Sequence, residues 1–283
     1  MATPSRFTLN DLRLARSAGP PRAMLTCYDY TTATLLEQAG VPLILVGDSA
    51  SNVILGHAST LPVTLSFMIE ITAAVKRGTS RALVIGDMPF GSYHASESQA
   101  IRNVAKMIKR SHCDAVKIEA GHTQVELVSK LADAGVAIIA HLGLRPQAVG
   151  LMGGYRYQGR TVREAQQIVD LAVQFSQAGA AAILLEAVPP EVSERVVDHV
   201  AVPVIGCGAG PACHAHVVVL QDLLHQTPHR AKFVPSTPPA GSLIETAKRF
   251  VMEVESRAYP SQAHCYEMPP DEKAKFLSSG VVV

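Results

Sequence analysis

Ionisable side chains stand at the ends of several short apolar runs in this chain. They are Asp29, Asp48 followed by Ser49, Asp87, Lys117 with Glu119, His141 and Glu186. A single residue of this kind usually begins a turn, and we interpret Asp29 in that way. The set as a whole predicts more, because several carboxylates gathered in an apolar setting need a compensating cation.

Three of the carboxylates predict a cation site. Asp48, Asp87 and Glu119 belong to three successive apolar runs. Oxygen ligands of this kind suit Mg²⁺, which takes one or two carboxylates together with several waters and substrate oxygens. A zinc site rich in thiolates or imidazoles is disfavoured, because no cluster of Cys and His residues competes with the acids.

Lys117 and Glu119 are two residues apart, so in a strand both side chains point to the same side. Lys117 could neutralise Glu119, bind a substrate carboxylate, or form a Schiff base as a lysine with a lowered pKa can. We favour the charged, carboxylate-binding role, because the nearby acids should raise the pKa of Lys117. Glu186 has no cationic neighbour in the sequence and is a candidate general base, although a salt bridge to an unseen partner would explain it equally well.

The apolar runs themselves are typical of buried parallel strands. They are short and rich in Val, Ile and Leu, and three of them follow a helix-like segment that ends in Ala-Gly. The predicted strands cover residues 23–29, 43–49, 82–89, 115–121, 137–143, 182–188 and 203–210, with a weaker eighth pattern at 231–234. Helical patterns lie between them, including a last helix at 245–257 preceded by the cap residue Ser242.

This alternation predicts a closed (β/α)8 TIM barrel, with a doubly wound open sheet as the rival. We expect a single barrel domain over residues 1–264, with a short N-terminal helical segment, and a polar C-terminal tail over 265–283. The carboxyl ends of barrel strands meet at one mouth, which would bring the ionisable residues together. The stretch 50–64 would form a lid or wall of that mouth, and the glycine-rich stretch 206–211 a tight turn.

Composition narrows the class of protein. The 283 residues are 48% apolar and 17% charged, enough to bury a large core. A net charge of +1 and the absence of Trp argue against a nucleic-acid partner, and no apolar run is long enough for a membrane helix. Five scattered cysteines without a CxxC pair favour a reducing compartment, so we expect a soluble cytoplasmic protein that acts on small molecules.

Acids, a metal ion, a lysine and a separate base together suit enolate chemistry. The metal would chelate the carboxylate and keto oxygens of a 2-oxo acid while the base removes a proton from the adjacent carbon. The enolate would then attack an electrophile and form a carbon-carbon bond, in a metal-dependent reaction of the aldol type.

Over about residues 23–264 the chain resembles the ketopantoate hydroxymethyltransferase family. The motifs that carry the resemblance are MLTCYDY (24–30), LVGDSASNV (45–53), STLPVT (59–64), GDMPFGSY (86–93), VKIEAG (116–121), AHLGLRPQ (140–147), GGYRYQGR (153–160), LLEAVP (184–189) and PVIGCGAGP (203–211). The resemblance implies a Mg²⁺-dependent barrel of the phosphoenolpyruvate/pyruvate type that acts in pantothenate biosynthesis. It would transfer a hydroxymethyl group from 5,10-methylenetetrahydrofolate to 3-methyl-2-oxobutanoate and give 2-dehydropantoate. It also implies a homo-oligomer, commonly a decamer.

The resemblance also implies a role for each site residue. Asp48 and Asp87 would bind the metal, with Glu119 completing its coordination directly or through water. The residues implied to hold the 2-oxo acid are Asp48, Ser49, Asp87 and Lys117. Glu186 would be the catalytic base.

Three positions depart from the family pattern. Ala58 replaces an acid, Cys213-His214-Ala215-His216 stands where the family has Cys-Asp-Gly-Gln, and Ala263-His264-Cys265-Tyr266 stands where it has Glu-His-Ser-Phe. The second departure puts loop order, folate binding or subunit contacts in doubt, and we expect His214 and His216 to be a solvent-exposed pair in a loop.

Two other interpretations remain. A lyase or mutase of the related barrels would share the enolate chemistry, although the Lys-Arg-Cys-Gly lid motif of isocitrate lyases is absent. A non-catalytic paralogue that binds a ligand or assists assembly is the other.

Overall fold

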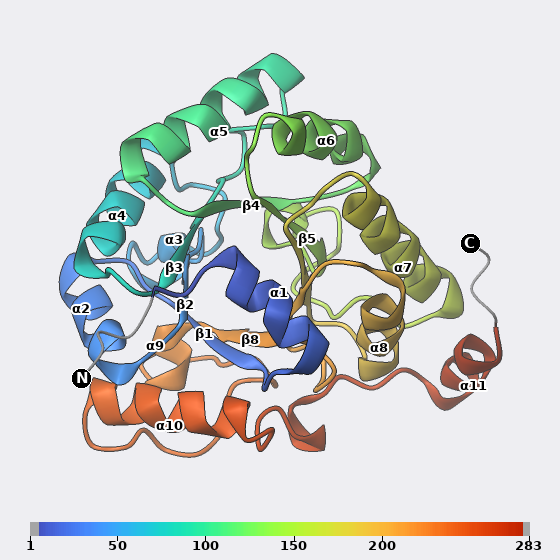
Figure 1. Ribbon diagram of the computed structural model, residues 1–283. Coiled ribbons are helices and arrows are strands. Elements are labelled where there is room, and N and C mark those ends of the chain that lie inside the picture. The colour runs from blue at the N-terminus through green and yellow to red at the C-terminus, as the bar shows by residue number, and fades with distance from the viewer. Residues whose placement is uncertain (1–5, 280–283) are drawn as a thin grey trace.

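The computed structural model describes residues 6–279, which form a closed barrel of eight parallel strands (Figure 1). The strands are β1 (Arg22–Thr26), β2 (Leu43–Val46), β3 (Leu83–Asp87), β4 (Ala115–Glu119), β5 (Ile138–Gly143), β6 (Ala182–Glu186), β7 (Val204–Cys207) and β8 (Ala215–Val218). Each strand pairs with the next along the chain, and β8 returns to pair with β1. The predicted (β/α)8 barrel is therefore confirmed and the open sheet is excluded.

Helices surround the barrel on its outside (Figure 1). They are α1 (Leu9–Ala18), α2 (Tyr30–Ala39), α3 (Ala50–Val53), α4 (Leu65–Gly78), α5 (Glu97–Ser111), α6 (Val125–Asp133), α7 (Val162–Gln177), α8 (Pro190–His199), α9 (Leu220–Leu223), α10 (Leu243–Glu255) and α11 (Pro270–Ser278). The last predicted helix corresponds to α10, which begins with a reciprocal capping box between Ser242 and Glu245. The helix α1 lies across the barrel in Figure 1, and its Leu12 is fully buried in the barrel interior.

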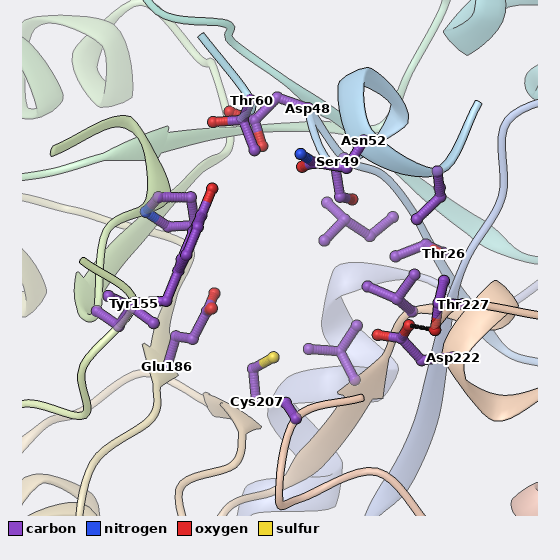
Figure 2. Close-up of a pocket in the computed structure, with 18 of the residues that line it drawn as sticks. Thr26, Asp48, Ser49, Asn52, Thr60, Tyr155, Glu186, Cys207, Asp222 and Thr227 are labelled. Atoms are coloured by element: carbon purple, nitrogen blue, oxygen red, sulfur yellow. Dashed lines mark hydrogen bonds between the residues drawn. The ribbon is translucent and has the colours of Figure 1, made fainter. Parts of the chain in front are cut away.

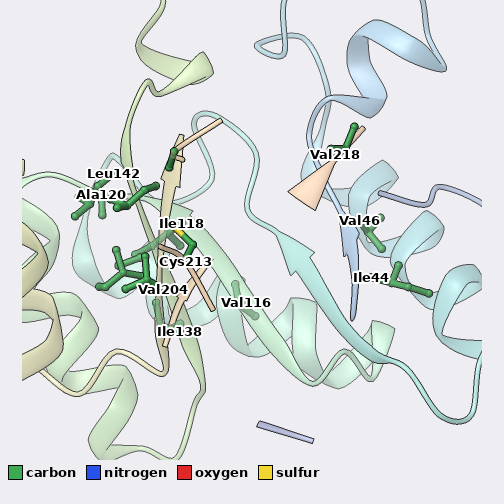
Figure 3. Packing of buried hydrophobic residues seen from close by; sticks show 14 of the residues in the cluster. Ile44, Val46, Val116, Ile118, Ala120, Ile138, Leu142, Val204, Cys213 and Val218 are labelled. Atoms are coloured by element: carbon green, nitrogen blue, oxygen red, sulfur yellow. The ribbon is translucent and has the colours of Figure 1, made fainter. Parts of the chain in front are cut away.

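Side chains along each strand point alternately into the barrel and out toward the helices. This alternation produces two separate apolar clusters. On β2, Leu43 and Leu45 belong to the cluster inside the barrel, while Ile44 and Val46 belong to the cluster between the barrel and its helices. Figure 3 shows part of this outer cluster, with Ile44 and Val46 pointing away from the strand that carries them. Because both faces of a parallel strand are buried, the sequence of each strand is a continuous apolar run.

The predicted position of the eighth strand was wrong. It is formed by Ala215–Val218, whereas residues 231–234 form turns. The expectation of a helix between all successive strands caused the error, because β7 and β8 are joined by the short loop 208–214 alone. Phe233 is buried in that misassigned segment and packs onto Gly208, where a Cβ atom would lie 2.3 Å from its ring. The left-handed φ of 69° at Gly208 adds a second reason for glycine in this turn.

The predicted tail contains the helix α11, which packs beside α7 and α8 (Figure 1). Phe276 is fully buried, and Arg195 of α8 lies over its ring and donates a hydrogen bond to its carbonyl oxygen. The division of the chain at residue 264 stays a prediction. Residues 280–283 of the predicted tail, and residues 1–5 of the predicted barrel domain, lie outside the described residues.

Candidate active site

The strand period that builds the core also directs the polar side chains into the barrel mouth. On β3, Leu83 and Ile85 point into the barrel, so Asp87, two residues further on, points into it as well. The same parity on β4 places Lys117 and Glu119 inside, above Ala115. These two strands thus contribute apolar layers at the bottom of the barrel and polar residues at their carboxyl ends.

A cavity of about 770 Å³ opens at this mouth (Figure 2). Five of the six predicted site residues line it, namely Asp48, Ser49, Asp87, Lys117 and Glu186. Glu119 is buried behind the cavity wall, and Asp29 instead caps the helix α2 by accepting a hydrogen bond from the Thr32 amide. The stretch 50–64 forms part of the wall, since Asn52, Ala58 and Thr60 among others line the cavity.

Asp48, Asp87 and Glu119, together with Lys117, are called the acid group here. A buried ion pair lies at its centre. The Lys117 ammonium Nζ is 2.9 Å from Asp87 Oδ2, which also accepts a hydrogen bond from the Asp48 amide at 3.0 Å. Burial alone would lower the pKa of Lys117, but the charges of Asp87, Asp48 and Glu119 outweigh it and raise that pKa. The lysine is therefore charged, which excludes the neutral amine that a Schiff base requires.

A residue without a predicted role connects two of the acids. The Gln147 side chain donates a hydrogen bond to Asp48 Oδ2 at 2.9 Å, and its backbone amide lies 3.1 Å from each carboxylate oxygen of Glu119. The Tyr93 hydroxyl completes the network by donating to Gln147 Oε1 at 2.7 Å. Tyr93 lies in a loop after β3 and Gln147 in a short 3-10 helix after β5, so the strand pattern of the sequence carried no signal for them.

Glu186 stands apart from the acid group, beside a neutral histidine. Its Oε2 is 3.3 Å from His141 Nε2, close but not aligned as a full hydrogen bond, and His141 Nδ1 is 3.3 Å from Lys117 Nζ. Because an ammonium can only donate, Nδ1 accepts and Nε2 carries the proton that faces Glu186. Burial, then the Lys117 charge, lowers the pKa of His141 well below its usual range. Burial raises the pKa of Glu186 to about 7.

The charges of the acid group leave a deficit that a divalent cation would fill. Three carboxylates face one ammonium, and Asp87 Oδ1 is buried without a hydrogen-bond partner among residues 6–279. Burial raises the pKa of Glu119 well above its usual range. Burial also raises the pKa of Asp87; the Lys117 charge opposes this shift and the Asp48 charge adds to it. Asp48 and Asp87 therefore fit a metal ion in their chemistry and position.

Glu119, the predicted third metal ligand, does not line the cavity that Asp48 and Asp87 line. No group of three His, Cys, Asp or Glu side chains in the described part of the chain is arranged to hold a metal ion. Glu119 is turned toward the Gln147 amide, whereas Asp87 Oδ2 accepts a hydrogen bond from the Asp48 amide and both aspartates line the cavity. One or two carboxylates are enough for Mg²⁺ when waters and substrate oxygens complete its coordination.

The expectation for the two unusual histidines was wrong. His216 is 2% exposed on β8 and packs edge-on against Tyr259, and burial lowers its pKa to about 3. His214 is half-buried and its Nδ1 accepts a hydrogen bond from the Val204 amide at 2.9 Å. Neither residue lines the cavity. They are structural groups at the start of β8, where the apolar alternation of the strand places His216 on the helix-facing side.

Between residues 6 and 279, no helix combines the length and apolarity required to cross a membrane.

Solved structures of other enzymes share this fold. Phosphoenolpyruvate phosphomutase from Streptomyces platensis subsp. rosaceus superposes with a TM-score of 0.59 at 16% identity, over 77% of this chain and 83% of that chain. A phosphonopyruvate hydrolase in complex with oxalate and Mg²⁺ superposes with a TM-score of 0.52 at 18% identity, over 75% and 80% of the two chains. Identities this low show the fold alone, which is the (β/α)8 TIM barrel expected from the sequence.

Curated relatives are much more similar in sequence. The 3-methyl-2-oxobutanoate hydroxymethyltransferase of Thermobifida fusca is 43% identical over 262 residues, which cover 92% of this chain and 94% of the relative. The enzyme of the same name from Koribacter versatilis is 41% identical over 95% of this chain and 92% of its own. A family model described as ketopantoate hydroxymethyltransferase matches residues 6–262. The chain is therefore an enzyme of the transferase class and belongs to the ketopantoate hydroxymethyltransferase family.

Proposed function

We propose that this protein transfers a hydroxymethyl group from 5,10-methylenetetrahydrofolate to 3-methyl-2-oxobutanoate, giving 2-dehydropantoate for pantothenate and coenzyme A biosynthesis. The observation that carries the proposal is one cavity in which the Asp48, Asp87 and Lys117 group faces a separate, partly buried carboxylate, Glu186. Family membership supplies the substrate names.

The acid group binds the 2-oxo acid in this proposal. The charged Lys117 attracts the substrate carboxylate, and its ion pair with Asp87 holds the ammonium at the cavity wall. Ser49 Oγ, which is 2.8 Å from the Tyr28 hydroxyl, is a further donor or acceptor at the same end. Together these contacts orient the substrate with its branched carbon toward Glu186.

Asp48 and Asp87 are the residues that would hold a divalent cation, for which we propose Mg²⁺, with Glu119 acting directly or through water. The unpartnered Asp87 Oδ1 supports this assignment. When bound, the cation supplies positive charge against the negative charge that develops on the keto oxygen of the substrate. The phosphonopyruvate hydrolase of the same fold holds Mg²⁺ with oxalate, a small dicarboxylate.

Glu186 acts as the general base. Water adds to the methylene carbon of the folate as one of its two C–N bonds opens, and cleavage of the second C–N bond releases tetrahydrofolate, with both nitrogens protonated, and leaves formaldehyde in the cavity. Glu186 removes the proton on C3 of 3-methyl-2-oxobutanoate, C3 forms a bond to the carbon of formaldehyde, and the oxygen takes up a proton to become the new hydroxyl group. A base with a pKa of about 7 is suited to this step, because it is both substantially ionised and basic near neutral pH.

The two other interpretations lose support for different reasons. A phosphomutase and a lyase share the fold at 16% and 19% identity, whereas hydroxymethyltransferases match this chain at 39% to 43% identity. A non-catalytic paralogue would have no need to keep Asp48, Asp87, Lys117 and Glu186 around one cavity. Ala58, which replaces an acid of the family pattern, lies in the cavity wall and leaves this group intact.

The proposal also includes the oligomeric state and the cellular location of the protein. We infer from the resemblance a homo-oligomer, a decamer in its commonest form, that acts in the cytoplasm. Light scattering on the purified protein tests the decamer.

The proposal is tested by proton exchange and transfer measured separately. In deuterated buffer the protein should exchange the C3 proton of 3-methyl-2-oxobutanoate, as followed by NMR, and should form 2-dehydropantoate when 5,10-methylenetetrahydrofolate is added. EDTA should abolish both reactions and excess Mg²⁺ should restore them. Activity that survives thorough chelation would remove the metal from the proposal, and no exchange under any condition would favour the non-catalytic paralogue.

A further inference from the structure

The cavity extends well beyond the acid group, to a wall built from residues after β8. Figure 2 shows Glu186 and Tyr155 on one side of the cavity and Asp222 with Thr227 on the other, with Cys207 between them. Cavities of about 300–1,000 Å³ hold drug-sized ligands, and the five-carbon 2-oxo acid fills only part of such a volume. The far wall is therefore available to a second, larger substrate.

Asp222 is the acidic group of this far wall. Thr227 Oγ1 donates a hydrogen bond to Asp222 Oδ1 at 2.5 Å, and Figure 2 shows the other carboxylate oxygen directed into the cavity. Across residues 6–279 no ion pair involves Asp222 and no hydrogen bond reaches its Oδ2. A half-buried carboxylate with an unused oxygen can accept hydrogen bonds from a ligand that carries N–H donors.

The surroundings of Asp222 are apolar at the floor and basic at the rim. Val217 and Val219 lie on the β8 side of the cavity, and Phe233 is a buried ring that also lines it. His229 and Arg230 line the exposed edge, and Arg230 is near enough for its charge to act on Asp222. An apolar slot with one carboxylate fits a flat heterocycle, and a basic rim fits an anionic tail.

We propose that Asp222 binds the 2-amino-4-oxopyrimidine edge of the reduced folate, with its N3–H and 2-amino groups donating to the carboxylate. This inference rests on the proposed function, which supplies the folate as the one-carbon donor. Two adjacent N–H donors match the two oxygens of a carboxylate, and such charge-assisted pairs are short and directional. The pterin then lies against Val219 and Phe233, and its reacting nitrogens point across the cavity toward Glu186.

Asp222 could instead serve only to hold Thr227 in place. The two roles differ in one respect, because only ligand binding makes Asp222 sensitive to the 2-amino group of the folate. The substitution Asp222→Asn keeps the size of the side chain and an oxygen for Thr227, while it replaces a carboxylate oxygen by an NH₂ group that repels the ligand donors. The exposed Asp198 on α8 offers the same chemical change outside the cavity, so Asp198→Asn is the matched control.

The experiment measures binding by calorimetry under anaerobic conditions, with tetrahydrofolate and with an analogue whose 2-amino group is replaced by methyl. Since a hydrogen bond to a charged group is worth about 1.5–3 kcal/mol, Asp222→Asn should weaken tetrahydrofolate binding at least about tenfold. The unmodified protein should bind the analogue more weakly by a similar factor. Asp222→Asn should bind tetrahydrofolate and the analogue with equal affinity. The loss of affinity caused by the substitution and the loss caused by removing the 2-amino group should therefore not multiply.

Three outcomes would overturn the inference. Equal tetrahydrofolate affinity of Asp222→Asn and Asp198→Asn, or losses that multiply, would leave Asp222 with a structural role only. Full affinity of the unmodified protein for the analogue would do the same without any variant, so the test holds even if Asp222→Asn fails to fold. If the unmodified protein does not bind tetrahydrofolate at all, the donor assignment of the proposed function fails, and the inference fails with it.

Discussion

Replacement of Glu186 by glutamine should make the protein more stable at alkaline pH while it slows proton abstraction. The carboxylate is held in a mostly apolar part of the cavity beside a neutral His141, and burial raises its pKa from 4.5 to about 7. The folded protein therefore pays a free-energy cost to keep this group ionised. Glutamine has nearly the same shape and carries no charge at any pH, so it removes that cost.

The size of the effect follows from the pKa of Glu186. One pKa unit corresponds to about 1.36 kcal/mol, so the difference between 4.5 and about 7 corresponds to roughly 3 kcal/mol. A carboxyl whose pKa is raised by folding stabilises the protein while it is protonated, and this contribution is lost as the pH rises from 4.5 through about 7. Glu186→Gln should therefore exceed the unmodified protein in free energy of unfolding by roughly 3 kcal/mol at pH 8 and by less than about 1 kcal/mol at pH 5.

Urea denaturation at the two pH values measures this difference. Glu267→Gln is the matched control, because Glu267 is exposed and lies outside the cavity, and it should change neither value by more than about 0.5 kcal/mol. The same samples report on chemistry. Exchange of the C3 proton should fall by about 10²–10⁴-fold in Glu186→Gln, the usual contribution of a general base.

The pH profile of exchange gives an independent check on the same residue. In the unmodified protein the rate should rise about tenfold per pH unit below pH 7 and level off near pH 8, with half of the maximum at about pH 7. A rate that is flat between pH 5.5 and 8 would refute the assignment of Glu186 as a base with a raised pKa. The same holds if the advantage of Glu186→Gln over the unmodified protein in free energy of unfolding is no larger at pH 8 than at pH 5.

Two further predictions concern the ion pair and the C-terminal helix. Lys117→Met leaves the buried Asp87 without its cation, so the free energy of unfolding measured in urea should fall by about 3–5 kcal/mol. The KM for the 2-oxo acid should rise. Stability equal to that of the unmodified protein would contradict the pairing. Phe276→Ala removes a fully buried ring that Arg195 covers, at a cost of about 3–5 kcal/mol, so α11 should detach and become sensitive to limited proteolysis; a resistant tail would show that α11 docks by other contacts.

The convergence of the site could be predicted from the sequence because it depends on strand parity. Once the apolar runs are assigned as parallel strands, the inward position of Asp87 follows from Leu83 and Ile85, and that of Lys117 from Ala115. The barrel then brings the strand ends together whatever the loops do. The fold and the inward positions of Asp87, Lys117 and Glu119 were for this reason accessible without coordinates, whereas Asp48 lies in the turn after β2, to which strand parity does not extend.

Contacts made by loops could not be predicted in the same way. Gln147 lies in a short 3-10 helix after β5, and its path back to Asp48 and Glu119 depends on packing that no periodic pattern records. His141 was recognised as a strand-end residue, but its proximity to Glu186 depends on the register between β5 and β6. The eighth strand was also hard to recognise because its short run, AHVV, contains His216, which was assigned to a loop.

The closure of the barrel between β1 and β8 also bears on how the protein folds and how long it lasts. Thr26 of β1 and Val217 of β8 both line the cavity, so the complete cavity exists only when the first and last strands are paired. Pairing of segments so distant in sequence carries a large loop-closure entropy and completes late in folding. Ligands in the cavity bind the closed barrel and not the open one, and at a hundred times the dissociation constant such binding adds about 2.7 kcal/mol to its stability. Bound substrate therefore also favours the pairing of β1 with β8, so the supply of substrate influences how long the folded protein persists.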